Sequence, residues 1–105
     1  MSYNIDLQKI ADELDFDLED VEMLLEVFME SAKESLESLK VAIDDNNFEG
    51  IFHAAHAIKG SSANLTLMDI SNIAKEIELE ARADNSINYL EKYNNLKVLL
   101  DNLES

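Results

Sequence analysis

Several residue types are scarce or missing in this 105-residue chain, and each absence excludes something. There is no cysteine, which excludes a disulfide framework, a thiol nucleophile and cysteine-ligated zinc. There is no proline and there are only two glycines, so few residues interrupt helices. No apolar run approaches the ~20 residues of a membrane span. Residues 1–6 carry no basic start and no apolar run, so we expect no signal peptide and a cytoplasmic location.

Positive charge is also scarce, because eight Lys and Arg residues stand against 23 Asp and Glu and the formal net charge is −15. Nucleic acid and anionic membrane surfaces would repel such a chain, so we expect neither as a partner. Hydrophobic residues make up 47% and charged residues 30%, a balance that suits a globular protein. We expect one domain over residues 1–105, and a monomer.

Apolar residues recur at helical spacing along the whole chain. We expect five helices, at about residues 6–14, 17–43, 47–65, 66–81 and 87–103. Asp17, Asn46 and Thr66 are the expected N-caps of the second, third and fourth helices. The expected apolar stripes include Leu18 and Leu24 in the second helix and Leu90 in the last. The sequence therefore predicts an all-α fold, an antiparallel up-down four-helix bundle with an additional short N-terminal helix.

The third predicted helix holds both histidines, and the window from Gly50 to Met68 contains no Asp or Glu. In so acidic a chain, a window without acids favours an anion. With ~100° per residue, one face of this helix is apolar. That face comprises Phe48, Ile51, Phe52, Ala55, Ile58, Ser62 and Leu65. His56 lies roughly 125° from its centre, exposed in mid-helix, with Lys59 at the border and Gly60 outside.

This arrangement suits a phosphoryl-accepting histidine. Neutral imidazole is a nucleophile at physiological pH, and Lys59, one turn from His56, can offset charge on phosphoryl oxygens. Gly60 does not point at the core, so a bare patch that admits another protein explains it better than helix packing does. No motif would bind ATP or cradle phosphates, so we expect a carrier and not an enzyme. The ordinary alternatives are a surface histidine without function and a solvated lysine.

The run from His56 to Leu65 resembles the signature of histidine-containing phosphotransfer (HPt) domains. That signature reads His-x-Leu/Ile-Lys-Gly-Ser/Ala-Ser/Ala, followed by small or polar residues and a Leu. The preceding Ala54 and Ala55 and the later run 79–82 (Leu-Glu-Ala-Arg) are similar to the family as well. Family members often have Gly directly after the Leu, where this chain has Thr66.

The resemblance implies an intermediate of a multistep His–Asp phosphorelay. His56 would be phosphorylated on its outward Nε2, Lys59 would assist the phosphoryl group, and Gly60 would admit the partner. The expected partners are response-regulator receiver domains and a hybrid sensor histidine kinase. We expect no cofactor of the domain's own, with Mg²⁺ on the partner receiver. The expected docking surface comprises Gly60, Ala57, Ala63, Asn64 and His53.

Three other interpretations remain open. Glu49, His53 and His56 fall at i, i+4 and i+7 and could share a metal ion, although the neighbouring Lys59 opposes a cation. For that reason we expect no metal site. The domain could belong to a kinase in which the histidine takes phosphate directly from ATP on a separate catalytic domain. It could also be a helical adaptor with no chemistry.

Overall fold

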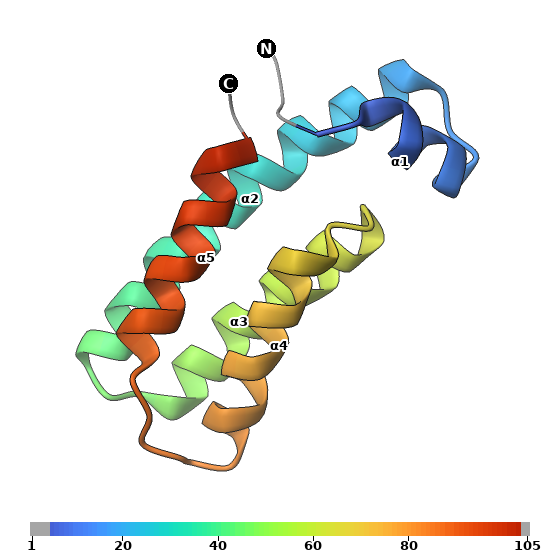
Figure 1. The fold of residues 1–105 in the computed structure, drawn as a ribbon. Coiled ribbons are helices and arrows are strands. Elements are labelled where there is room, and N and C mark those ends of the chain that lie inside the picture. The colour runs from blue at the N-terminus through green and yellow to red at the C-terminus, as the bar shows by residue number, and fades with distance from the viewer. Residues whose placement is uncertain (1–4, 104–105) are drawn as a thin grey trace.

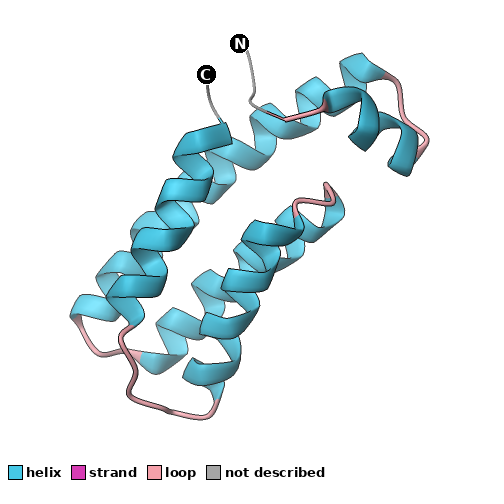
Figure 2. Ribbon diagram, in the orientation of Figure 1, coloured by secondary structure: helices cyan, strands magenta, loops and turns pink. Residues whose placement is uncertain are grey.

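The computed structural model describes residues 5–103, and within that range the protein is entirely helical, with no strand (Figure 2). The helices are α1 (Leu7–Leu14), α2 (Leu18–Asp44), α3 (Phe48–Asn64), α4 (Met68–Arg82) and α5 (Tyr89–Leu103). The all-α prediction is therefore confirmed. No helix in the described part of the chain is long and apolar enough to cross a membrane.

Each of the four longer helices packs against two of the others, so that together they enclose a common core. α2 contacts α3 and α5, and α4 contacts the same two helices, while α1 packs against α2. Figure 1 shows α2 and α5 as one pair beside the pair formed by α3 and α4. The 27 residues of α2 are roughly 40 Å long at 1.5 Å per residue, which matches the 42 Å length of the molecule. α2 extends beyond the turn between α3 and α4, and α1 lies against this extension (Figure 1).

One apolar core lies between the four longer helices. Its largest fully buried side chains include Leu25, Leu39, Ile51, Ile58, Ile77, Leu96 and Leu100. The stripe predictions are wrong at Leu18, Leu24 and Leu90, which are all exposed. With ~100° per residue, Leu18 and Leu24 lie at the two edges of the apolar stripe, whereas Val21 and Leu25 lie nearer its centre and are fully buried. Leu90 is exposed because α5 begins at Tyr89, and Tyr89 takes the buried position.

The turns between the helices correct two predicted caps. The N-cap of α3 is Asn47 and not Asn46: the Asn47 side chain accepts a hydrogen bond of 3.1 Å from the Gly50 N–H. Asn46 instead has a left-handed φ of 53°, which Asn tolerates. Thr66 is not the cap of α4 either, since Leu67 holds that place and Thr66 has a φ of 60°. Thr66 thus occupies the kind of turn position that favours glycine.

The start of α3 is fixed against α2 at Gly50. A Cβ atom on Gly50 would lie 3.0 Å from the Ala42 Cβ and 3.0 Å from the Asn47 side-chain nitrogen. The missing side chain therefore allows α2 and α3 to approach closely beside the Asn47 cap. This contact, together with the cap, sets where α3 begins and hence how its faces are oriented farther along.

Candidate functional site

His56 lies in the middle of α3 with its side chain 60% exposed. The core positions of the helix, Ile51, Ala55 and Ile58, are almost fully buried on another side. The Phe52 ring lies one turn earlier and stacks on the imidazole, with centroids 5.8 Å apart and planes 14° from parallel. The ring is thus supported on one side and reachable by a partner.

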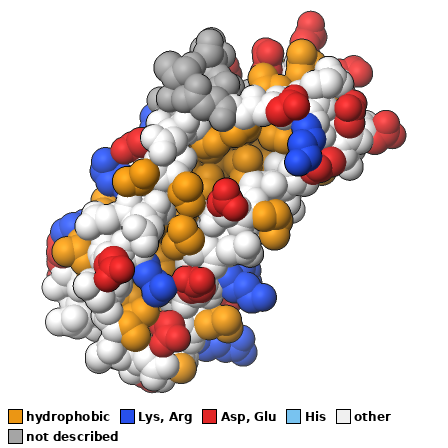
Figure 3. Space-filling view, in the orientation of Figure 1, with side chains coloured by type: hydrophobic (Ala, Val, Ile, Leu, Met, Phe, Trp, Pro, Cys, Tyr) orange, Lys and Arg blue, Asp and Glu red, His pale blue; other side chains and the backbone are white. Residues whose placement is uncertain are grey.

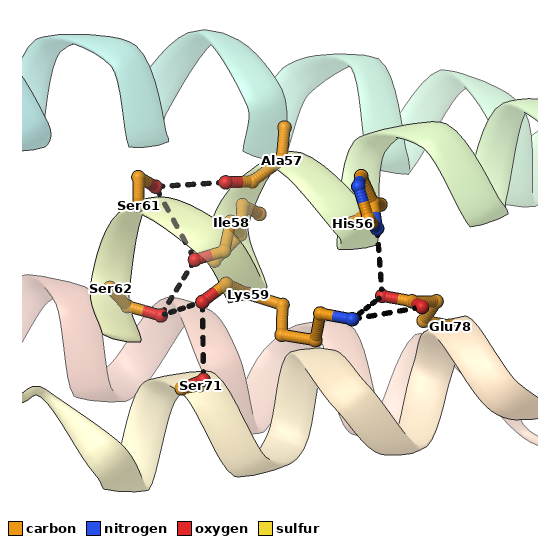
Figure 4. A network of polar contacts seen from close by, with 8 residues as sticks. All are labelled: His56, Ala57, Ile58, Lys59, Ser61, Ser62, Ser71 and Glu78. Carbon is orange, nitrogen blue, oxygen red and sulfur yellow. Dashed lines mark hydrogen bonds and ion pairs between the residues drawn. The ribbon is translucent and has the colours of Figure 1, made fainter. Parts of the chain in front are cut away.

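A carboxylate from α4 holds the inner nitrogen of this ring (Figure 4). The His56 Nδ1 lies 3.2 Å from Oε2 of Glu78, whose side chain is only 7% exposed. The same carboxylate accepts from the Lys59 Nζ, which lies 3.0 Å from Oε1 and 2.9 Å from Oε2. The buried carboxylate therefore has a partner on each side, and it joins His56 and Lys59 into one network.

The ionisation of Glu78 decides which ring nitrogen of His56 carries the proton. Burial alone raises the pKa of the Glu78 carboxyl, but hydrogen bonds from Lys59 and His56, with the charges of both, lower it below its usual value. At neutral pH the group is a carboxylate and can only accept hydrogen bonds. Nδ1 must therefore donate, and in the neutral ring the exposed Nε2 keeps its lone pair as the nucleophilic atom.

Two serines lie beside this network, and one of them links α3 to α4. Ser71 of α4 donates a hydrogen bond of 3.1 Å to the carbonyl oxygen of Lys59 (Figure 4). Ser62 is fully buried and donates to the carbonyls of Ile58, at 2.6 Å, and Lys59, at 3.2 Å. The small buried hydroxyls let the helices lie close together. Glu78 is thereby kept within hydrogen-bonding distance of both His56 and Lys59.

The sequence model of the Hpt domain matches residues 23–105 of this chain. The chain belongs to the Hpt domain family. It is a histidine phosphotransfer domain of two-component signalling, and such domains are phosphocarrier modules rather than catalysts. It is similar to the chemotaxis protein CheA of Borreliella burgdorferi, with 39% identity over 82 residues. That similarity covers 69% of this chain and 9% of the relative, so the chain spans a small part of that protein's length. No solved structure matches it.

The sequence analysis missed Glu78, although it is a central residue of the site in this Hpt domain. The window from Gly50 to Met68 lacks acids along the chain, but folding brings a carboxylate against His56 from α4. A window without acids in the sequence is therefore not a surface without acids in the fold. One signal was available: Glu78 is four residues after Ala74 and three before Ala81, both in the apolar stripe of the fourth helix. An acid beside a buried stripe needs a cation partner.

The five residues of the expected docking surface are all exposed along α3; they are His53, Ala57, Gly60, Ala63 and Asn64. A Cβ atom on Gly60 would meet no heavy atom within 4 Å. Helix packing within the described chain therefore does not require glycine at this position. Lys59 is 29% exposed, consistent with its expected place at the border of the core.

The alternative metal site is not formed by the three side chains that suggested it. His53 Nε2 lies 3.6 Å from Glu49 Oε1, but Nδ1 of His56 is directed to Glu78. Among residues 5–103, no group of three or more His, Asp or Glu side chains is arranged to hold a metal ion. The observed geometry thus gives this alternative no support.

Proposed function

We propose that this Hpt domain is a carrier in a multistep His–Asp phosphorelay. His56 accepts a phosphoryl group from the aspartyl phosphate of one response-regulator receiver domain and passes it to another, downstream of a hybrid sensor histidine kinase. The observation that supports this most is the pairing of an exposed His56 Nε2 with an Nδ1 that a buried carboxylate holds. That pairing leaves one nitrogen free to react and orients it outward.

The transfer itself requires few groups from this chain. The Nε2 lone pair attacks phosphorus, a nitrogen–phosphorus bond forms, and the bond between phosphorus and the acyl oxygen of the receiver breaks. The receiver aspartate leaves as a carboxylate. The proton on Nδ1 stays in place, and Glu78 offsets the positive charge that the ring gains. The reverse sequence delivers the phosphoryl group to the next receiver.

Lys59 and Gly60 would assist on either side of this step. Lys59 lies one turn beyond His56, and its flexible side chain can turn its ammonium from Glu78 toward the phosphoryl oxygens. Gly60 leaves open space where a receiver must bring its aspartate within about 3–3.5 Å of Nε2. Ala57, Ala63, Asn64 and His53 would extend this docking surface along α3.

The remaining expectations belong to the same proposal. The domain needs no cofactor of its own, because Mg²⁺ on the receiver neutralises charge on the transferring group. The helices would form an antiparallel up-down four-helix bundle of α2 to α5, with α1 as the additional N-terminal helix. We expect it to act as a monomer.

A second candidate function rests on the 39% identity with a chemotaxis protein. In this version the same His56 takes phosphate from ATP bound to a separate catalytic domain, and the domain serves chemotaxis signalling. The site chemistry is the same, because Glu78 and Lys59 act on the ring and the phosphoryl group and not on the donor. The two candidates therefore share the site and differ in the phosphoryl donor and in the signalling that the domain serves.

Phosphotransfer profiling separates these candidates. The domain is incubated with labelled ATP and Mg²⁺ alone, then with each phosphorylated receiver of the same organism, and then with histidine kinase catalytic domains and ATP. We expect no label from ATP alone and rapid labelling from one or a few receivers. Labelling by catalytic domains but by no receiver would favour the second candidate, and labelling by neither would refute the carrier function.

A further inference from the structure

Positive charge is unevenly placed on this acidic protein. In Figure 3, red Asp and Glu side chains outnumber the blue Lys and Arg side chains on the visible face. Several lysines are paired with acids, as in Lys40–Asp44, Lys92–Glu76 and Lys97–Asp101. Lys75 and Arg82, in contrast, form no ion pair with any of residues 5–103, although the chain carries 23 acids.

Lys75 and Arg82 flank the buried carboxylate of the site. Lys75 is three residues before Glu78 in α4 and Arg82 is four residues after it, so the three side chains share one face of the helix. Lys75 and Arg82 are exposed. Glu78 is the acid on their face, but its two oxygens are already bound by Lys59 and His56. Lys59, Lys75 and Arg82 thus form a cationic strip beside His56, with a single buried carboxylate among them.

The acids nearest in sequence do not cancel this strip. Glu76 pairs with Lys92 of α5, and Glu80 accepts a hydrogen bond from Asn85, so both are directed away from α3. On α3, Glu49 lies about two turns before His56 and pairs with His53. From Gly50 to Met68 the chain has no acid. On the α4 side of α3, the surface beside His56 therefore carries more positive than negative side chains, on a protein of net charge −15. On the α2 side, Glu34 and Glu37 line a groove with His53 and Ala57, so the positive surface is confined to the α4 side.

We infer that the cationic strip is an electrostatic docking surface for a receiver domain with an acidic phosphorylation site. This inference rests on the proposed function. A centre that binds Mg²⁺ and a phosphoryl group supplies carboxylates to the metal, so its rim is acidic. The overall charge of this chain would repel such a rim. Lys75 and Arg82 make the surface positive where the two proteins must meet. Their charge would speed the association of the receiver and fix its orientation on the domain.

Each cation also has an ordinary alternative. Arg82 lies in the last turn of α4, where a positive charge stabilises the helix C-terminus. Lys75 lies in mid-helix and has no such role, so it is the cleaner test. Lys97 of α5 is the matched control, because it is exposed, pairs with Asp101 one turn away, and changes the net charge by the same amount when replaced.

The experiment uses a receiver domain that labels the wild-type chain, phosphorylated with acetyl phosphate. Second-order transfer rates are measured for the wild type, Lys75→Glu, Arg82→Glu and Lys97→Glu, at about 50 mM and about 500 mM salt, where screening lengths differ about threefold. We expect each strip variant to slow transfer by about 3- to 10-fold at low salt, with most of the loss removed at high salt. Lys75→Arg should match the wild type, as should Lys97→Glu.

The outcomes separate the strip from the proposed function. Equal rates for Lys75→Glu and Lys97→Glu, with wild-type labelling intact, would overturn the docking role of the strip alone. A Lys75→Glu loss that persists at high salt would also overturn it, because an electrostatic effect is screened. Absence of labelling in the wild type with every receiver would overturn the proposed function first, and the strip with it. Thermal melts of all variants show whether a loss reflects unfolding.

Discussion

Replacing Glu78 by glutamine tests the role of the buried carboxylate most sharply. The amide has nearly the same shape and keeps one oxygen that can accept a hydrogen bond from His56 Nδ1. In the wild type this nitrogen lies 3.2 Å from the carboxylate. It removes the negative charge and leaves Lys59 without its ion-pair partner. Because Lys59 is 29% exposed, its ammonium can turn toward water, and we expect the fold to persist.

The size of the effect follows from the lost charge. A hydrogen bond to a charged group contributes about 1.5–3 kcal/mol and a neutral one about 0.5–1.5 kcal/mol, a difference of about 1–1.5 kcal/mol. His56 is 60% exposed, so solvent screens the interaction and the lower figure applies. Since about 1.4 kcal/mol is tenfold in rate, we expect Glu78→Gln to transfer phosphate about 3- to 10-fold more slowly. The transfer rate falls only by the share of this interaction energy that is gained as the ring becomes positively charged in the transition state.

Rapid-quench measurements with a labelled receiver give the rate constants. Glu76→Gln is the matched control, because it makes the same change on α4 at a position that is 59% exposed and pairs with Lys92. Nitrogen NMR of the imidazole supplies a second readout: the wild type should carry its proton on Nδ1, and Glu78→Gln should show a mixture of tautomers. A Glu78→Gln protein with the rate of Glu76→Gln and an unchanged tautomer would refute the positioning role.

Three further predictions concern the same face of α3. Lys59→Ala should slow transfer or shorten the phosphohistidine lifetime by about 2- to 30-fold in quench and decay assays, since one charge-assisted contact contributes about 0.5–2 kcal/mol. It should also lower the free energy of unfolding by about 1–2 kcal/mol, because the buried Glu78 loses a partner. Gly60→Gln should melt no lower than the wild type, since glycine is the poorer helix former and its Cβ would meet open space, and yet transfer phosphate poorly. A lower melting temperature there, or normal transfer, would contradict the docking role. Finally, the pKa of Glu78 is lowered in the folded state, so the ionised carboxylate stabilises the fold fully above about pH 4.5, and this stabilisation is lost as the pH falls through the folded-state pKa. In urea titrations, the free energy of unfolding of the wild type should therefore exceed that of Glu78→Gln by less below that pH.

Helical periodicity located much of this site because its signal is local. Whether His56 lies inside or outside α3 depends on a step of ~100° per residue and on the apolar residues around it. The exposed histidine, the half-buried Lys59 and the outward Gly60 all follow from that count. The sequence thus predicted the face of the helix on which His56, Lys59 and Gly60 lie.

The contact between His56 and Glu78 could not be predicted from helical periodicity. It joins residues 22 positions apart, and it depends on how α3 and α4 turn toward each other, which the hydrogen bond from Ser71 and side-chain packing decide. The turns limited the prediction for a different reason. Asn46 and Thr66 are good N-cap residues by type, but each adopts a left-handed φ in a tight connection between helices, and the next residue takes the N-cap.

The central claim is that His56 is the phosphorylated residue. The domain is labelled by a phosphorylated receiver, and the acid-labile, base-stable phosphate is located by mass spectrometry. We predict the label on His56 Nε2, no label in His56→Gln, and nearly wild-type labelling in His53→Gln, whose ring lies beside Glu49 and away from the Glu78 network. Labelling that persists in His56→Gln would contradict the account.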